Sequence, residues 1–133
     1  MAKRWNLGPS FPDDLRSAEW SRFVEIEPFT RQWARLGLGD DDLQALQGAI
    51  IRSPEVGDVV RGAGGVRKVR FAPPGRGKSG AYRVFYANLP GHGVVFLMTT
   101  LSKGDRGNLN KADRNALAGR LAVLRDLIDK GGL

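Results

Sequence analysis

The sequence contains no cysteine and a single histidine, His92, and these two absences exclude several kinds of site. Without cysteine there is neither a disulfide framework nor a thiolate metal site, a composition that suits a reducing compartment. One histidine is too few for the usual zinc ligand sets. We therefore expect no metal and no cofactor, and any chemistry has to come from other side chains.

Long apolar runs are also missing. No stretch approaches the roughly 20 residues that span a bilayer as a helix. The N-terminal segment MAKRWNLGPSF lacks the hydrophobic region of a secretory signal peptide. With 133 residues, of which 41% are hydrophobic and 26% charged, the chain has the size and composition of one soluble domain. We therefore expect a cytoplasmic protein that does not associate with a membrane.

Acidic residues are absent from one long segment. Between Asp58 and Asp105 there is none, although eight of the 21 basic residues fall there. Residues 1–58 hold seven basic and ten acidic residues, and residues 105–133 hold six basic and four acidic ones. The net charge of +7 therefore originates mainly in this segment. Its eight cations are Arg61, Arg67, Lys68, Arg70, Arg76, Lys78, Arg83 and Lys103.

This basic segment has two interpretations. A solvated loop with arginines and lysines that keep the protein soluble is the simpler one. Here, however, the cations alternate with apolar residues at strand spacing and are interrupted by glycines. That pattern favours a surface that meets a polyanion, most simply a phosphate backbone.

The order of apolar patterns predicts an α+β domain at residues 21–133, preceded by an N-terminal extension at residues 1–20. The extension is rich in Pro, Asp and Arg, and we expect it to be loosely ordered or packed on the domain through its aromatic residues. A strand, two helices, three strands and a final helix follow in that order. The connections between the last three strands suit hairpins, so we expect a small, mainly antiparallel sheet with all three helices packed on it. The expected strands span 22–27, 66–71, 82–87 and 94–100; the expected helices begin at Pro28, Asp40 and Asn110.

Strand alternation places two cations together. In 66–71, Val69 and Phe71 fall on one face, so Lys68 and Arg70 project from the other. Two side chains at this spacing stand about 7 Å apart, close to the separation of adjacent phosphates along a single nucleic-acid strand. Arg83 begins the next strand and is expected across the hairpin from them. Lys68 is the candidate general base, and the arginines are candidates to stabilise charge on a phosphorus-centred transition state. A strand whose solvent face simply carries Lys and Arg is the alternative.

Two other patterns are weaker. The run GRGKS resembles the end of a phosphate-binding P-loop, but Ala72 occupies the position of the first glycine, and a strand rather than a helix follows. His92 lies between two glycines in an expected turn, which favours an exposed loop tip over a catalytic role.

Several short motifs occur in a fixed order: GxGGxRKxR at 62–70, GKSG at 77–80 and RVxY at 83–86. FLMTTLSKGDRGNLNKADRNAL then covers the last strand and the start of the last helix, and the EIEPF and DDDLQALQGAII segments fit the same pattern. Over residues 21–129 the sequence resembles the RelE/HigB family of bacterial toxins, in particular its HigB-like branch.

The resemblance implies a RelE-like fold and the toxin of a type II toxin–antitoxin module. Members of the family cut mRNA in the ribosomal A site, which inhibits translation, through attack of a ribose 2′-hydroxyl on the adjacent phosphate. The implied partners are the ribosome, mRNA and a cognate antitoxin, expected to be a small helix-turn-helix protein. Carried over by position, the catalytic residues are Lys68, Arg70, Arg83 and Lys78, and the lysine after the last strand matches Lys103. The candidate RNA-binding residues are Arg61, Arg67, Arg76, Ser79 and Lys103.

The chain departs from the family pattern at three points. Ala81 stands where a second glycine is common, and Leu101 stands where an aromatic residue is usual. No tyrosine lies near the C-terminus, so Tyr82 or Tyr86 would have to stack on a base. Leu101 leaves one alternative open, a catalytically inactive protein of the same fold that binds ribosome, RNA or antitoxin. A DNA-binding subunit that assists an antitoxin is a further alternative.

Overall fold

The computed structural model describes residues 2–6, 22–53, 55–73, 82–102 and 109–132. Within these residues, six strands form one sheet in the order β1-β2-β6-β5-β4-β3. All neighbouring strands are antiparallel except β2 and β6, which run parallel. The α+β class and the mainly antiparallel sheet expected from the sequence are therefore confirmed.

The strands and helices follow the expected order, with two additional strands. The strands are Ala2–Asn6 (β1), Arg22–Ile26 (β2), Asp58–Val59 (β3), Arg67–Phe71 (β4), Tyr82–Leu89 (β5) and Val94–Ser102 (β6). The α-helices are Glu27–Arg35 (α2), Asp40–Arg52 (α3) and Lys111–Asp129 (α4), and a short 3-10 helix, η2, spans Pro90–His92. Strands β1 and β3 were not predicted. Because β1 pairs with β2, part of the expected N-terminal extension belongs to the sheet.

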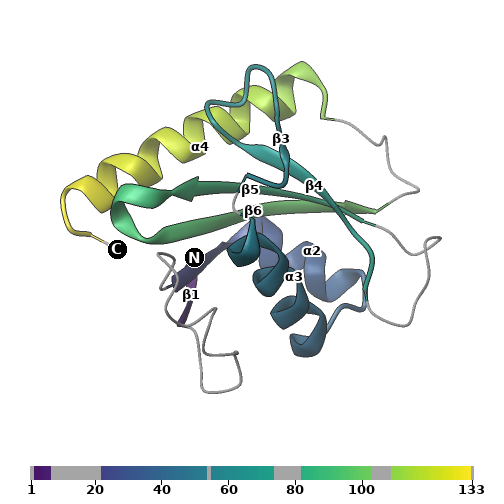
Figure 1. The fold of residues 1–133 in the computed structure, drawn as a ribbon. Helices are drawn as coiled ribbons and strands as arrows, with labels where there is room; N and C mark the ends of the chain where they lie inside the picture. Colours follow the sequence, from purple (N-terminus) through teal and green to yellow (C-terminus); the bar gives the residue numbers. More distant parts are fainter. Residues whose placement is uncertain (1, 7–21, 54, 74–81, 103–108, 133) are drawn as a thin grey trace.

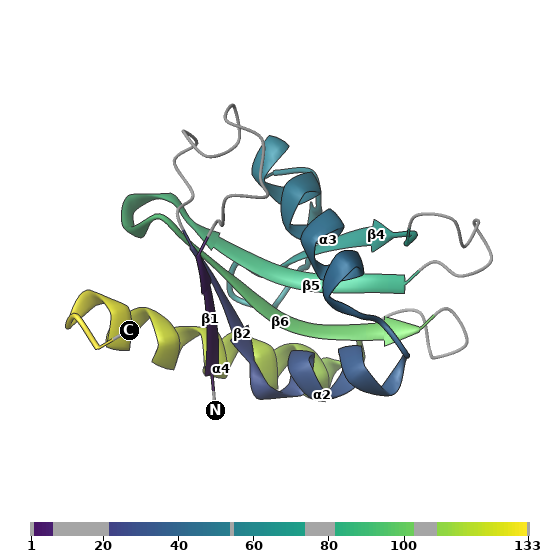
Figure 2. The ribbon, with the colours of Figure 1, turned by 90° about the horizontal axis from the view of Figure 1, so that it is seen from below.

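Helices cover both faces of the sheet. Figure 1 shows α4 above the sheet and α2 with α3 below it, and Figure 2, seen from below, shows α3 in front of the sheet. On the α2–α3 side, the aromatic ring of Trp33 stacks between Phe29 and Phe71, with ring-centroid distances of 5.2 Å and 5.9 Å. The apolar stripe of α3 closes this first core through Leu43, Leu46 and Ile50.

The second core lies between the sheet and α4. The apolar stripe of this helix is buried there, with Leu117, Leu121, Leu124 and Ile128 packed against the sheet. Asn110 caps α4 as expected, because its Oδ1 accepts a hydrogen bond of 2.7 Å from the Asp113 amide. None of the described helices is long and apolar enough to cross a membrane.

Strand β6 separates the two cores, as the continuous apolar run Val94–Met98 predicts. Val95 and Leu97 belong to the first core, while Phe96 and Met98 belong to the second. The pairing of β6 with β5 shifts register between Phe85 and Tyr86. Such a bulge bends and twists the sheet locally, here at the position where the candidate site begins.

Candidate functional site

Three cations lie together on the α4 side of the sheet. In β4, Val69 and Phe71 pack into the first core. Because side chains alternate along a strand, Lys68 and Arg70 project to the α4 side. Arg83 on β5 is the direct cross-strand partner of Arg70. We call Lys68, Arg70 and Arg83 the cationic face; Arg70 is exposed and the other two are half-buried. The structure thus brings together three of the four residues expected to be catalytic.

The cationic face holds like charges at close range. Directly opposite residues of an antiparallel pair have Cβ atoms about 5 Å apart, and like charges at such positions destabilise the sheet. Arg70 and Arg83 stand in this relation. A bound polyanion would remove the repulsion, so the arrangement is suited to phosphate binding rather than to stability.

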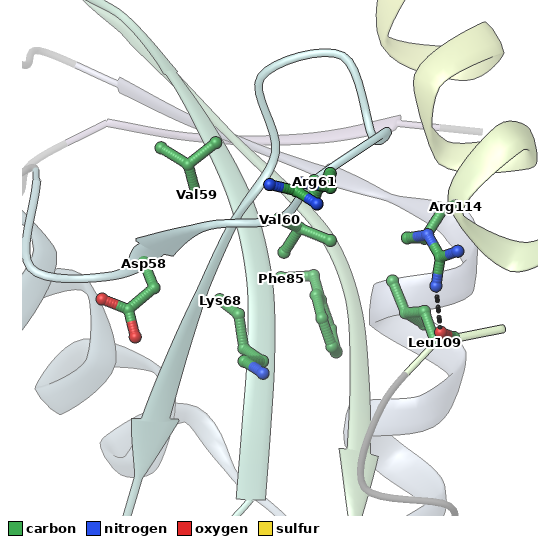
Figure 3. A pocket seen from close by; sticks show the side chains of 8 residues that line it. All are labelled: Asp58, Val59, Val60, Arg61, Lys68, Phe85, Leu109 and Arg114. Atoms are coloured by element: carbon green, nitrogen blue, oxygen red, sulfur yellow. Dashed lines mark hydrogen bonds between the residues drawn. The ribbon is translucent and has the colours of Figure 1, made fainter. Parts of the chain in front are cut away.

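A pocket of about 410 Å³ lies beside Lys68 on the same side of the sheet. Figure 3 shows Lys68 between Asp58 and Phe85, in agreement with their direct cross-strand pairing to it. Cations and one carboxylate line the pocket. Three further lining residues, Val60, Phe85 and Leu109, are apolar and partly or fully buried. The lining residues are Asp58, Val59, Val60, Arg61, Lys68, Phe85, Leu109 and Arg114.

The wall of the pocket opposite β4 comes from the start of α4. The Arg114 Nη1 donates a hydrogen bond of 2.8 Å to the carbonyl oxygen of Leu109, drawn as a dashed line in Figure 3. This bond fixes the guanidinium while its remaining N–H groups keep their capacity to donate. Arg114 and Leu109 thereby form one preorganised wall.

The glycines between Arg61 and Val66 position this wall. Gly62 and Gly64 have positive φ angles of 79° and 73°, which L residues with a side chain rarely adopt. A Cβ on Gly64 would lie 3.2 Å from the Cβ of Ala118 on α4. The glycines of the GxGGxRKxR motif therefore let the turn approach α4 closely. Part of a motif that suggested function is thus explained by packing.

Arg67 does not join the cationic face. Its cross-strand partner is Tyr86, on the other side of the sheet, and its Nη1 donates a hydrogen bond of 2.8 Å to the Gly57 carbonyl oxygen. The Gly57 amide in turn donates a hydrogen bond of 3.0 Å to the buried Tyr86 hydroxyl. Arg67 was expected to bind RNA, but in the structure it holds the segment before β3 against the sheet.

Neither tyrosine of the chain lies on the cationic face. Tyr86 is fully buried in the first core, and Tyr82 packs against the same core. Burial raises the pKa of the Tyr86 hydroxyl, and the hydrogen bond from Gly57 and the charge of Arg67 offset only part of this effect. The two tyrosines considered as stacking residues therefore face away from the candidate site.

Of the five expected site residues that remain, the structure describes one, Arg61. Arg61 lines the pocket and is exposed. Leu101 is the cross-strand partner of Arg83, which puts it beside the cationic face. Four residues lie outside the described part of the chain: Arg76, Lys78, Ser79 and Lys103.

His92 lies at the other end of the β5–β6 hairpin from Arg83. Its exposed ring Nε2 is 2.9 Å from Oδ1 of Asp129, near the end of α4. The position agrees with the expected exposed tip and places the imidazole away from the pocket. Among the described residues there is also no cluster of three or more potential metal ligands.

Sequence reasoning missed Asp58 and Arg114 as neighbours of Lys68. Strand β3 has only two residues and leaves no periodic pattern, and Arg114 reaches the pocket from a distant helix. The only indication was that Asp58 ends the acidic part of the chain just before the cationic segment. A scan against protein-family models finds no match for this chain.

Proposed function

We propose that this protein is the toxin of a type II toxin–antitoxin module and a ribosome-dependent mRNA endonuclease. The observation that supports this most directly is the pairing of Arg70 with Arg83, with Lys68 on the same face of the sheet. The resemblance of residues 21–129 to the RelE/HigB family and the α+β order of elements agree with it. The proposal places the protein in the cytoplasm, with ribosome, mRNA and an antitoxin as partners.

The proposed reaction is an internal transesterification of RNA. The 2′-oxygen of a ribose attacks the adjacent phosphorus, the bond from phosphorus to the 5′-oxygen breaks, and a 2′,3′-cyclic phosphate and a 5′-hydroxyl result. Lys68 in its uncharged form accepts the 2′-hydroxyl proton, and the departing 5′-oxygen takes a proton from solvent. Arg70 and Arg83 stabilise the negative charge that develops on the phosphoryl oxygens. Alignment of the RNA by the ribosome supplies much of the rate.

Primer extension on a defined mRNA in a reconstituted translation reaction tests the proposal. We expect cuts that require ribosomes and that disappear in the double variant Lys68→Ala, Arg70→Ala. The double variant should keep its fold, since Arg70 is exposed and Lys68 is half-buried at the pocket. The matched control is Arg31→Ala, Lys130→Ala, which removes an exposed arginine of α2 and an exposed lysine just after α4 and should cut normally.

Cuts that persist in the double variant at the native rate would contradict the assignment of the site. Cuts that occur equally without ribosomes would contradict ribosome dependence.

A second function is favoured by one observation: both tyrosines lie on the opposite face and Leu101 replaces the usual aromatic residue beside Arg83. A protein without a stacking residue would bind RNA or the ribosome and not cut. Ribosome binding that depends on Lys68 and Arg70, without any cuts, would support this second function. Tight binding to duplex DNA by the isolated chain would instead support the DNA-binding subunit.

A further inference from the structure

The pocket beside Lys68 differs chemically from the cationic face. A purely cationic surface binds any polyanion, whatever its bases. The pocket adds an apolar part, made of Val60, Phe85 and Leu109, and a single carboxylate, Asp58. Its volume of about 410 Å³ falls in the range of small-molecule sites. These features fit a ligand that has a phosphate, a flat weakly polar body and N–H donors.

The carboxylate stands at a defined position. Asp58 is the direct cross-strand partner of Lys68, so its side chain and the lysine share one face of the β3–β4 pair. Asp58 is exposed at the edge of the pocket, which leaves its oxygens accessible to a ligand. The segment just before it is held to the sheet at both polar groups of Gly57, by Tyr86 and by Arg67. The carboxylate therefore extends from an anchored strand.

An ionised carboxylate accepts hydrogen bonds and donates none. Of the four RNA bases, guanine alone presents two adjacent N–H donors, on N1 and on the exocyclic N2, and a carboxylate accepts from both at once. Adenine and cytosine present one amino donor beside an acceptor nitrogen, and uracil presents one donor between two carbonyl oxygens. These acceptors would face the negative charge of Asp58. A carboxylate at the base position of a nucleotide site therefore favours guanine over the other three bases.

The cations around the pocket come from three parts of the fold. Arg61 and Lys68 line it from the turn after β3 and from β4, and Arg114 lines it from α4, a set suited to a phosphate. The bond from Arg114 to the Leu109 carbonyl holds one end of the guanidinium in place. A fixed guanidinium loses less conformational entropy when a phosphate binds than a mobile one would.

We propose that this pocket binds one guanine nucleotide of the RNA, with Asp58 on the base and Lys68, Arg61 and Arg114 around its phosphate. The proposal rests on the proposed function in taking RNA as the ligand. It adds a base preference and a residue that sets it, neither of which follows from the cationic face.

The experiment is a titration of the isotope-labelled protein with guanosine, adenosine, cytidine and uridine monophosphates, followed by nuclear magnetic resonance at constant ionic strength. We expect shifts at the amides of Val60, Lys68 and Arg114, and a dissociation constant at least about fivefold lower for the guanine nucleotide. In Asp58→Asn this preference should fall below about twofold. Asp126→Asn, which changes an exposed carboxylate on α4, should leave it intact.

Equal affinity for the four nucleotides would overturn the base assignment, because the pocket would then bind phosphate alone. Shifts that map elsewhere, or no saturable shifts, would overturn the pocket itself. Since no ribosome is present, the outcome is separate from the cleavage test. Guanine-selective binding without mRNA cuts would leave this inference standing and contradict the endonuclease. Ribosome-dependent mRNA cuts together with equal affinity for the four nucleotides would support the endonuclease and contradict this inference.

Discussion

Tyr86 illustrates how one buried polar side chain organises the edge of the candidate site. Its hydroxyl accepts the Gly57 N–H, and Arg67 holds the carbonyl of the same glycine. A Cβ on Gly57 would lie 2.8 Å from the carbonyl oxygen of Lys68, so only glycine fits between Tyr86 and β4. Gly57, Arg67 and Tyr86 are not part of the cationic face, but they determine where β3 and Asp58 lie.

The first prediction concerns the stability of the protein at alkaline pH. The pKa of Tyr86 is raised above its ordinary value of 10.0, chiefly by burial. The unfolded chain therefore loses this proton at a lower pH than the folded one. The stabilisation by the protonated Tyr86 hydroxyl is therefore fully present below about pH 10 and is lost as pH rises through the pKa of the folded state. Urea unfolding between about pH 8 and pH 11 should show a fall in the free energy of unfolding that Tyr86→Phe reduces.

Tyr86→Phe should itself lower the free energy of unfolding at neutral pH by about 1–3 kcal/mol, since the buried Gly57 N–H loses its acceptor. An equal alkaline fall in both proteins would contradict the assignment to Tyr86. Tyr82→Phe is the control, because Tyr82 is only half-buried.

At the scale of elements, the turn between β3 and β4 packs closely on α4. Gly64 lies with its Cα hydrogens toward Ala118, and Gly65 would place a Cβ 2.8 Å from an arginine nitrogen of Arg125. This contact brings Arg61 and Arg114 to the same pocket. The pocket therefore depends on the packing of two elements that are distant in sequence.

The second prediction compares two Gly→Ala substitutions. Gly64→Ala should lower the free energy of unfolding by about 1–3 kcal/mol, because alanine is strained at a positive φ and its Cβ crowds Ala118. Gly119 lies on α4, next to Ala118, and a Cβ there would have no atom within 4 Å. Gly119→Ala should therefore raise the free energy of unfolding by up to about 1 kcal/mol. Denaturant unfolding measures both. Similar effects of the two substitutions would contradict the packing argument.

The third prediction concerns the pairing of Arg70 with Arg83 across β4 and β5. Arg70→Gln removes one of two like charges in direct opposition, so it should stabilise the free protein by about 0.2–1 kcal/mol. The gain should shrink as salt is added, because screening weakens the repulsion. Thermal unfolding at low and high salt measures it. Arg35→Gln is the control at an exposed helix position, and a salt-independent gain would point to a cause other than charge.

At the scale of the whole molecule, the charge is distributed unevenly. Five cations of the acid-free segment are described, and four of them (Arg61, Lys68, Arg70 and Arg83) lie on the α4 side of the sheet or line the pocket there, whereas Arg67 lies on the other side. The acidic residues of the first 58 residues lie partly at the start of α3, where Asp40, Asp41 and Asp42 face the positive end of the helix dipole. A polyanion would therefore approach the α4 side of the sheet.

The fourth prediction is the salt dependence of RNA binding. Each phosphate contact in a single strand contributes about 0.7 to the slope of log affinity against log salt. Lys68→Ala together with Arg70→Ala should therefore reduce the slope by about 1.4 if each residue contacts one phosphate. Fluorescence anisotropy with a labelled single-stranded RNA at several salt concentrations measures it. An unchanged slope would place the RNA elsewhere, and Arg31→Ala with Lys130→Ala should not alter it.

The sequence by itself determined the order of elements and the orientation of side chains within each. The Asp-rich start of α3, the Leu stripe of α4 and the alternation in β4 are local periodic patterns, so the helices, four strands and the shared face of Lys68 and Arg70 were predictable. Strand β1 and strand β3 were not, because each is defined by pairing with a partner strand rather than by its own pattern.

Only the tertiary structure decided which residues meet at the site. Asp58, Phe85 and Arg114 come from three distant parts of the chain, and no local period relates them to Lys68. Strand alternation already places Arg67 on the face opposite Lys68, but only the tertiary structure shows that Arg67 binds the carbonyl of Gly57 there. Local preferences fix a side chain relative to its own element, whereas contacts between elements depend on how the sheet and helices pack.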